Sequence, residues 1–386
     1  MIGQPFPSDE YDRRLWRVQH EMEQRGLDLL IVASPENTYY LTGYHTNGIV
    51  GYQYLAVPKD RAPLFMTRYL DLGNFMALAD SVAVTDYDSY DDHGDPIQVL
   101  AGLLRRNDCS RGRIGLEKRN LYLSVDHYER LQAALGACEF VDASTLIEEL
   151  RLVKSPAELA YHRQAAAIAV QGMRAAIAAA APGRMDNAVA AAGLSALISA
   201  GGEWIANWPY VKVGQQTGRG HSTWQNTPIG RGEPLTVELA GVVARYHSPL
   251  YRTVIFDPSP EQRRMAAALR EANQAGIDAM RPGITNGEAY QAFKSVVERH
   301  GYGDLLRHRN GYSVGVGFPP NWVQRFGVDI VHGGRAVLEP SMVFHVPTYL
   351  CRLNDYGMGE SATVLITERG RENLTDEMEP GPILVG

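Results

Sequence analysis

The sequence is poor in cysteine and has no excess of basic residues. Its 386 residues include only three cysteines, Cys109, Cys138 and Cys351, an odd number with no C-x-x-C pair. A chain of this size can bury a core without disulfide staples, so the cysteine usage indicates a reducing compartment. Lysine and arginine number 37 against 44 aspartates and glutamates, a formal net charge of −7. This balance gives no electrostatic reason to expect nucleic acid or an anionic membrane as a partner.

Long hydrophobic runs are also missing. The longest apolar stretch, residues 165–181, is rich in alanine rather than leucine and is interrupted by Gln171 and Arg174. A membrane-spanning helix needs about 20 strongly apolar residues. The first part of the chain carries charged side chains where a secretory signal would be apolar. Together with the cysteine usage, these features predict a cytoplasmic protein.

The composition is that of an ordinary globular protein, with 45% hydrophobic and 21% charged residues and length enough for about two domains. Apolar spacing predicts a helix over residues 11–25, and short apolar runs predict strands at residues 27–33 and 82–87. Such alternation is typical of an α/β layer domain, which is expected over residues 1–150. Its sequence has no glycine-rich loop of the kind that binds phosphate.

A second domain is expected over residues 151–386. Ser155, Pro156 and Glu158 have the spacing of a helix N-cap, a first helical residue and a capping box. Strand patterns dominate later, at residues 210–214, 234–239, 253–256, 342–346 and 363–367, with a helix at residues 261–280. Two helices each run into a Pro-Gly pair, at residues 182–183 and 282–283, and a further helix follows each pair. This repeat predicts two similar halves.

A single glutamate, Glu238, lies between apolar neighbours in a strand pattern, as a buried carboxylate does. Burial raises the pKa of a carboxyl group and prepares it for acid–base or nucleophilic chemistry. A structural pairing of Glu238 with an arginine is an equal alternative, and a lone histidine such as His247 or His345 is more commonly a satisfied core residue. Several such groups recur beside glycine-rich and aromatic-rich loops, which favours a small-molecule pocket.

These segments resemble a known family. Residues 37–44 (NTYYLTGY), 153–158 (VKSPAE) and 364–375 (VLITERGRENLT) occur in this order along essentially the whole chain. They are similar to the pita-bread superfamily of Xaa-Pro aminopeptidase, prolidase, methionine aminopeptidase and creatinase. The resemblance implies an α+β protein, in which an N-terminal α/β creatinase-like domain precedes a C-terminal pita-bread catalytic domain with two pseudo-symmetric halves.

The sequence departs from the peptidases of this superfamily at their metal ligands. Those enzymes hold two metal ions through two aspartates, one histidine and two glutamates, because a divalent ion needs anionic oxygens and imidazole to offset its dehydration. The matching positions here are Glu238, Pro249, Tyr312, Pro347 and either Ser361 or, with a shift of one residue, Glu360. At most two good ligands remain. The resemblance therefore implies no dinuclear metal site and no cofactor.

Within the metal-free branch, the segments around Glu238, His247, Tyr312 and His345 are most similar to the ectoine hydrolases, which open a cyclic amidine by hydrolysing a C–N bond. The resemblance implies a metal-independent hydrolase acting on a small cyclic amidine or amidino compound. Catalysis is assigned to Glu238, as nucleophile or general base, and to His221, as proton shuttle. The expected substrate-binding residues are His247, His345, Glu360, Tyr246, Tyr312 and Tyr44.

Other functions stay open from the sequence. They are a creatinase-like amidinohydrolase, a lyase acting on an osmolyte such as a sulfonium compound, a metal-dependent Xaa-Pro dipeptidase, and a binding module without activity. The expected partner is a small-molecule substrate, with neither nucleic acid nor membrane involved. The resemblance further implies a homodimer, in which the N-terminal domain can reach the neighbouring subunit's site.

Overall fold

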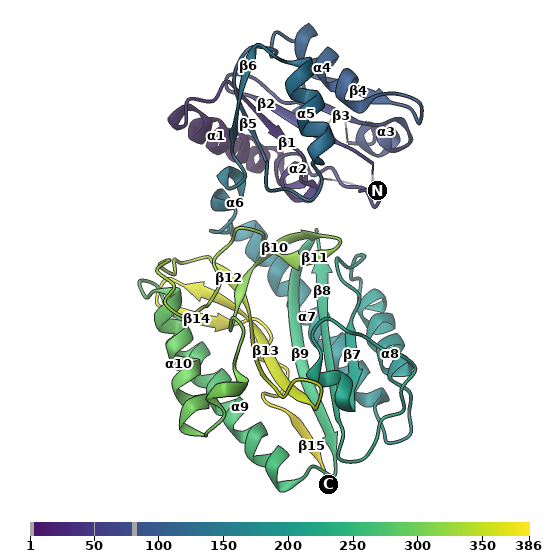
Figure 1. Cartoon of the computed structure of the whole chain (residues 1–386), viewed down its shortest axis with the longest axis vertical. Helices are drawn as coiled ribbons and strands as arrows, with labels where there is room; N and C mark the ends of the chain where they lie inside the picture. Colours follow the sequence, from purple (N-terminus) through teal and green to yellow (C-terminus); the bar gives the residue numbers. More distant parts are fainter. Residues whose placement is uncertain (1–3, 50, 79–82) are drawn as a thin grey trace. The chain divides into compact units, whose positions relative to one another are not determined.

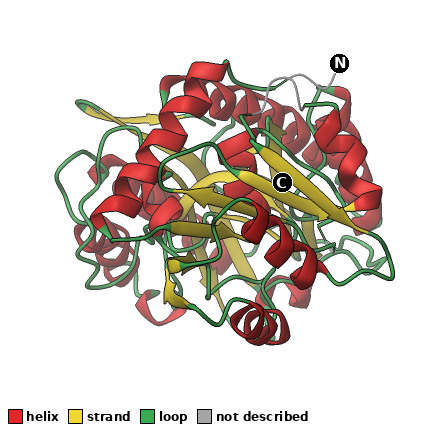
Figure 2. Cartoon of the chain, turned by 90° about the horizontal axis from the view of Figure 1, so that it is seen from above, coloured by secondary structure: helices red, strands yellow, loops and turns green. Residues whose placement is uncertain are grey.

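The computed structural model describes residues 4–49, 51–78 and 83–386. The chain divides into two compact units, Met1–Arg151 and Leu152–Gly386. Figure 1 labels their helices and strands, and Figure 2 colours the same elements by type. Among the helices of the described residues, none has both the length and the apolar character needed to cross a membrane.

The N-terminal unit contains one six-stranded mixed sheet. Its strands are β1 (Leu29–Val32), β2 (Tyr54–Pro58), β3 (Leu64–Arg68), β4 (Asp86–Tyr90), β5 (Gly112–Leu116) and β6 (Cys138–Asp142). Its helices are α1 (Ser8–Gln24), α2 (Pro35–Thr42), α3 (Tyr69–Met76), α4 (Pro96–Arg106), α5 (Val125–Ala134) and α6 (Leu146–Leu150). The strand order is β4-β3-β2-β1-β5-β6, and β1 pairs in parallel with β5 and antiparallel with β2.

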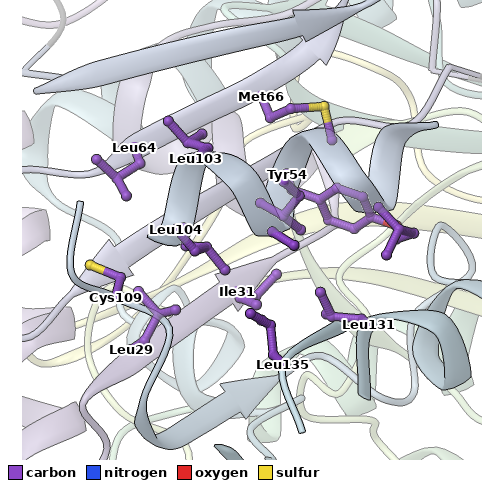
Figure 3. Packing of buried hydrophobic residues seen from close by; sticks show 14 of the residues in the cluster. Leu29, Ile31, Tyr54, Leu64, Met66, Leu103, Leu104, Cys109, Leu131 and Leu135 are labelled. Carbon is purple, nitrogen blue, oxygen red and sulfur yellow. The ribbon is translucent and has the colours of Figure 1, made fainter. Parts of the chain in front are cut away.

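The central strand β1 is buried on both faces. Leu29 and Ile31 pack in one apolar cluster with Leu104 of α4 and Leu131 of α5 (Figure 3). The alternate residues of β1 pack in a second cluster, which includes Met22 of α1. Two covered faces explain the unbroken apolar run of the sequence. The predicted helix at 11–25 and strand at 27–33 are confirmed. The strand expected from Val82 begins outside the described residues, and the structure starts β4 at Asp86.

Two buried carboxylates meet in this unit. The Asn37 side-chain amide donates to Glu117 at 2.6 Å and to Glu148 at 2.9 Å, and its oxygen accepts from the Arg151 guanidinium at 2.7 Å. Burial, reinforced by the negative charge of Glu117, raises the pKa of Glu148 to about 8. Because this pKa exceeds that of Glu148 in the unfolded chain, the Glu148 carboxyl group binds its proton more tightly in the folded unit. Its contribution to stability is complete at low pH and is lost as the pH rises through about 8.

Replacement of Glu148 by glutamine should remove this pH dependence. The amide has the shape of the protonated acid and carries no charge, so the Glu148→Gln protein should melt at a higher temperature than wild type at pH 9. The gain should be about 1.4 kcal/mol for each unit by which the native pKa is raised. At pH 4 the two proteins should melt together. Thermal melts of the full chain, with the exposed Glu129→Gln as control, measure this. Equal melting temperatures at pH 9 would contradict the interpretation.

The C-terminal unit is built on one nine-stranded sheet. Its strands are β7 (Tyr210–Val213), β8 (Pro234–Val243), β9 (Tyr246–Phe256), β10 (Tyr312–Phe318), β11 (Asn321–Val323), β12 (Val343–Cys351), β13 (Gly357–Thr367), β14 (Gly370–Asn373) and β15 (Ile383–Val385). The order is β14-β13-β12-β10-β9-β8-β7, with β11 on β10 and β15 on β9. The helices are α7 (Pro156–Ala179), α8 (Asp186–Ser199), α9 (Pro260–Ala279) and α10 (Asn286–Arg299), with short 3₁₀ turns η1 (Gly214–Gly218) and η2 (Gly303–Leu305).

The two halves repeat one local design. The predicted capping box at Ser155 begins α7, and Ser259 caps α9 in the same way. After each helix a glycine turns the chain with positive φ, 84° at Gly183 and 86° at Gly283. The following helices α8 and α10 lead back to the sheet. Helices α7 and α8 pack on β8 and β9, whereas α9 and α10 pack on β12 and β13. The predicted helix–Pro-Gly–helix repeat is therefore confirmed.

Strands β8 and β9 are longer than the sequence pattern predicts. They meet in a tight hairpin whose two turn residues, Ala244 and Arg245, both have positive φ (48° and 61°). Such a turn normally carries asparagine or glycine, so the sequence offered no hairpin signal. The Glu203 carboxylate compensates by accepting both turn N–H groups, at 2.9 and 3.1 Å. The Arg245 guanidinium also lies 3.6 Å from the centre of the Trp204 ring.

The helices cover one face of this sheet, so alternate residues of each strand point to opposite environments. On β8, a side chain at Gly241 would collide with the α7 backbone at Ala165. Position 241 thus faces α7, and Glu238, three residues earlier, faces the other way. On β12, Phe344 and Val346 join the apolar cluster under α9 and α10. His345 and Pro347 therefore lie on the same face as Glu238.

Candidate active site

A cavity of about 570 Å³ lies on the face of the C-terminal sheet that the helices leave open. Strands β7, β8, β9, β10 and β12 each contribute side chains to it. Its principal lining side chains are Asn207, Tyr210, Lys212, His221, Glu238, Tyr251, His308, Arg309, Tyr312, Pro320, Asn321, Trp322, Pro347 and Tyr349. Volume and lining are typical of a small-molecule site, with aromatic walls and few charged groups.

Glu238 is the acidic residue of the described cavity wall. In the sheet it stands opposite Tyr210 of β7 and Tyr251 of β9, so a tyrosine flanks it on each side. Its carboxylate has no hydrogen-bond partner among the described residues, and it faces the cavity. Burial raises the pKa of Glu238 to about 7, an effect that the Lys212 ammonium opposes. A carboxyl group with this pKa exchanges its proton near neutrality, as a general base or nucleophile requires.

Lys212 is a buried cation of the cavity wall that interacts electrostatically with Glu238. It lies on β7, two residues beyond Tyr210, and thus on the same face as Glu238. Its side chain is almost fully buried, and its ammonium donates to the Arg219 carbonyl at 3.1 Å. Burial lowers the pKa of Lys212, and the charge of Glu238 opposes this shift. Each of the two charges therefore stabilises the ionised form of the other group inside the site.

Four tyrosines surround the carboxylate. Burial raises the pKa of each of them, and the negative charge of Glu238 adds to the effect. They are Tyr210, Tyr251, Tyr312 and Tyr349. Their hydroxyls stay protonated at neutral pH and can therefore donate hydrogen bonds. The ring faces suit a flat cation, which aromatic rings attract electrostatically.

His221 lies at the rim of the cavity, in the turn after η1. Its backbone has φ of 49°, in the left-handed region that few non-glycine residues adopt. Its ring lies 5.9 Å from that of Tyr210, the cross-strand neighbour of Glu238. The structure therefore brings His221, Glu238 and Tyr312 to one cavity, and the roles expected for them stay predictions. The side chain of His221 is exposed.

His345 lies beneath the cavity wall and does not line it. Its ring is fully buried, and burial lowers its pKa to about 3. Nδ1 is 2.7 Å from the Tyr312 hydroxyl, and Nε2 is 2.7 Å from Oγ of Ser361. Trp322 Nε1–H also donates to the Tyr312 hydroxyl, at 3.0 Å. The expected role of His345 in holding substrate charge is not supported, because Tyr312 stands between it and the cavity.

Two more of the expected substrate-binding residues, His247 and Tyr246, are absent from the cavity wall. His247 is fully buried, with Nδ1 2.8 Å from the Arg245 carbonyl and Nε2 accepting from the Ala206 N–H at 3.3 Å. Tyr246 donates to Glu158 at 2.8 Å and stacks on Tyr161. These bonds engage both imidazole nitrogens and the phenol, so neither residue is placed to bind substrate.

Glu360 and Tyr44 are likewise absent from the cavity wall. Glu360 is on the face of β13 that packs under α9, together with its neighbour Ala362, and it accepts the Gly381 N–H. Ser361, one residue on, faces the opposite side, where it stands opposite Pro347 of β12. Tyr44 belongs to the N-terminal unit, where its ring packs 4.8 Å from that of Phe65. A buried core position explains Tyr44 without a substrate.

The peptidase ligand positions do not fit a pair of metal ions here. Glu238, Tyr312 and Pro347 line the cavity, and Ser361 lies behind it in a bond with His345. Pro249 pairs with Ala240 of β8 and is absent from the cavity wall, and its carbonyl accepts from the Thr363 hydroxyl at 2.8 Å. Within the described ranges no cluster of three or more His, Cys, Asp or Glu side chains could hold a metal ion. Proline has no side-chain donor, and a protonated tyrosine is a poor one.

Several cavity residues escaped sequence reasoning. Lys212, Arg309 and Tyr349 come from segments far apart in the chain and carry no motif. The alternation along β7 is the one signal that could have found Lys212, since a lysine within an apolar strand is rare unless it is paired. Arg309 lies over the Tyr312 ring at 4.5 Å and pairs with Asp329 at 2.8 Å.

The fold is a two-domain pita-bread architecture, and the family to which the chain is matched is one of hydrolases. Residues 160–368 match metallopeptidase family M24, and residues 14–153 match the creatinase/prolidase N-terminal domain. The chain belongs to family M24. It is 31% identical to the ectoine hydrolase of Halomonas elongata over 97% of each chain, and 25% identical to the Xaa-Pro dipeptidase of Pyrococcus furiosus over 94% of this chain and 97% of that one. The crystal structure of dipeptidase PepE from Mycobacterium ulcerans, 25% identical, covers 98% of this chain and 99% of its own with a TM-score of 0.82.

Proposed function

We propose that this protein hydrolyses a C–N bond of a small cyclic amidine without a metal ion, as in ectoine ring opening. The observation that carries the proposal is the state of Glu238. It is a lone carboxylate with a pKa near neutrality, placed where the family's peptidases have a metal ligand, and the other ligand positions hold proline, tyrosine and serine. The 31% identity to an ectoine hydrolase supports the same reaction class.

The chemistry follows from the substrate class. A protonated amidine is a flat cation whose central carbon is already electrophilic, so it reacts without a Lewis acid. The tyrosine rings and Glu238 would hold the cation, and Lys212 or Arg309 would hold a substrate carboxylate. Glu238 either attacks the carbon directly or removes a proton from the attacking water. His221 would then supply a proton to the departing nitrogen. That the protein works as a homodimer stays a prediction.

Product analysis tests the proposal. The purified protein should convert ectoine or hydroxyectoine into a product heavier by one water, at a rate that EDTA dialysis leaves unchanged and added Mn²⁺ or Co²⁺ does not raise. Mass detection of the product and metal analysis of the protein measure both parts. A creatine or Xaa-Pro dipeptide control separates the alternatives. Cleavage of the dipeptide that is lost with EDTA and restored by Mn²⁺ would overturn the proposal, as would elimination without uptake of water.

A further inference from the structure

The hydrogen bonds behind the cavity determine where the Tyr312 proton points. Three buried side chains form a chain from the protein interior to the cavity: Ser361 on β13, His345 on β12 and Tyr312 on β10. Ser361 Oγ already accepts the Tyr251 N–H, at 2.8 Å. Tyr312 Oη already accepts the Trp322 Nε1–H, at 3.0 Å. These two donors have fixed hydrogens, so they constrain the orientation of the others.

Only one arrangement leaves no enclosed hydrogen of this chain without an acceptor, because the one hydrogen that has no protein acceptor, that of the Tyr312 hydroxyl, then faces the cavity. If Nε2 of His345 carried the proton, Ser361 Oγ would receive two donors and its own buried O–H would have no acceptor among the described residues. A buried hydroxyl without an acceptor is costly. With the proton on Nδ1, Ser361 donates to Nε2 and His345 Nδ1–H donates to Tyr312. A doubly protonated His345 would be a buried cation with no carboxylate in contact, which is costlier still.

We infer that Tyr312 is a catalytic hydrogen-bond donor, whose hydroxyl proton is aimed into the cavity because His345 and Trp322 both donate to its oxygen. This inference rests on the proposed function for the identity of the acceptor. That acceptor is the nitrogen of the scissile C–N group, which gains a lone pair as the carbon is attacked, or the new oxygen. Two incoming hydrogen bonds polarise the phenol and strengthen the bond that it donates. His345 acts through Tyr312 and is a positioning residue.

NMR measurement of the His345 tautomer tests this hydrogen-bond network directly, and it does not require that the protein turn over a substrate. In the full-length protein labelled with ¹⁵N-histidine, NMR should show His345 as a neutral ring with the proton on Nδ1, assigned by its loss in His345→Asn. The inverse tautomer, with the proton on Nε2, would overturn the inference. The protein could show the Nδ1–H tautomer and yet hydrolyse no compound of the substrate panel. That result would contradict the proposed function and would still support the hydrogen-bond network.

Kinetics test the role of the hydroxyl. Tyr312→Phe should lower kcat about 10²–10³-fold with little change in KM, as removal of one oxyanion donor does. His345→Leu should lower kcat similarly, and His345→Asn, which keeps a donor near the Nδ1 position, should recover part of the loss. The double variant Tyr312→Phe/His345→Leu should be no slower than Tyr312→Phe alone. Tyr302→Phe, which loses a partly buried hydrogen bond to Glu261 outside the cavity, is the matched control. Unchanged kcat in Tyr312→Phe, or additive losses in the double variant, would overturn the inference.

Discussion

Glu238→Gln is expected to abolish turnover while making the protein more stable above neutral pH. The amide can neither attack carbon nor remove a proton, so kcat/KM should fall at least about 10³-fold. Burial raises the pKa of Glu238 to about 7, above that of the unfolded chain, so the native protein favours the neutral form. The stability contributed by this group is complete at low pH and is lost as the pH rises through about 7. Glutamine keeps the neutral form at every pH.

Two measurements distinguish the loss of a reacting group from a loss of activity caused by misfolding. Thermal melting at pH 8.5 should place Glu238→Gln above wild type, and at pH 4 the two proteins should melt together. Glu238→Asp keeps the charge but withdraws the carboxylate by one carbon, and a displacement of this size costs about 10²-fold in rate. The exposed Glu339→Gln serves as control for both assays. A Glu238→Gln protein that melts normally and retains activity would exclude Glu238 as the reacting group.

Lys212→Met is expected to shift the pH dependence of the enzyme. For wild type, kcat/KM should rise with pH through about 7 as Glu238 ionises. Removal of the ammonium leaves burial unopposed and raises the pKa of Glu238 further. The pH at which kcat/KM rises, the acid limb of the profile, should therefore move upward by at least about one pH unit. At a pH below this limb, kcat/KM should be about tenfold lower than in wild type for each pH unit of the move.

The charge-retaining variant Lys212→Arg separates the electrostatic role of Lys212 from its packing role. Its acid limb should stay close to that of wild type, even if its overall rate is lower because the larger guanidinium is harder to bury. The full pH–rate profiles of the three proteins measure this. An acid limb that stays near pH 7 in Lys212→Met would show that Lys212 does not tune Glu238.

Local chemistry in the sequence predicts much of the C-terminal unit. Ser155-Pro156 and the Pro-Gly pairs specify helix starts and stops through bonds and backbone angles that involve only nearby residues. The hairpin at Ala244 and Arg245 could not be predicted, because its turn is held by Glu203, some forty residues earlier. The length of β8 and β9 depends on that distant carboxylate.

In the candidate site, too, the sequence predicts some features and the tertiary structure decides the others. The sequence itself singles out Glu238 as an acid among apolar neighbours, and the prolines at 249 and 347 remove metal donors wherever they lie. Which face each side chain takes is decided by strand pairing, because a shift of one residue moves a side chain to the opposite side of the sheet. That rule puts Ser361 behind the cavity and Glu360 under α9, and it sets His345 against Tyr312 rather than against substrate. Residue types come from the chain, whereas their grouping into a cavity comes from long-range pairing of strands, which no local pattern encodes.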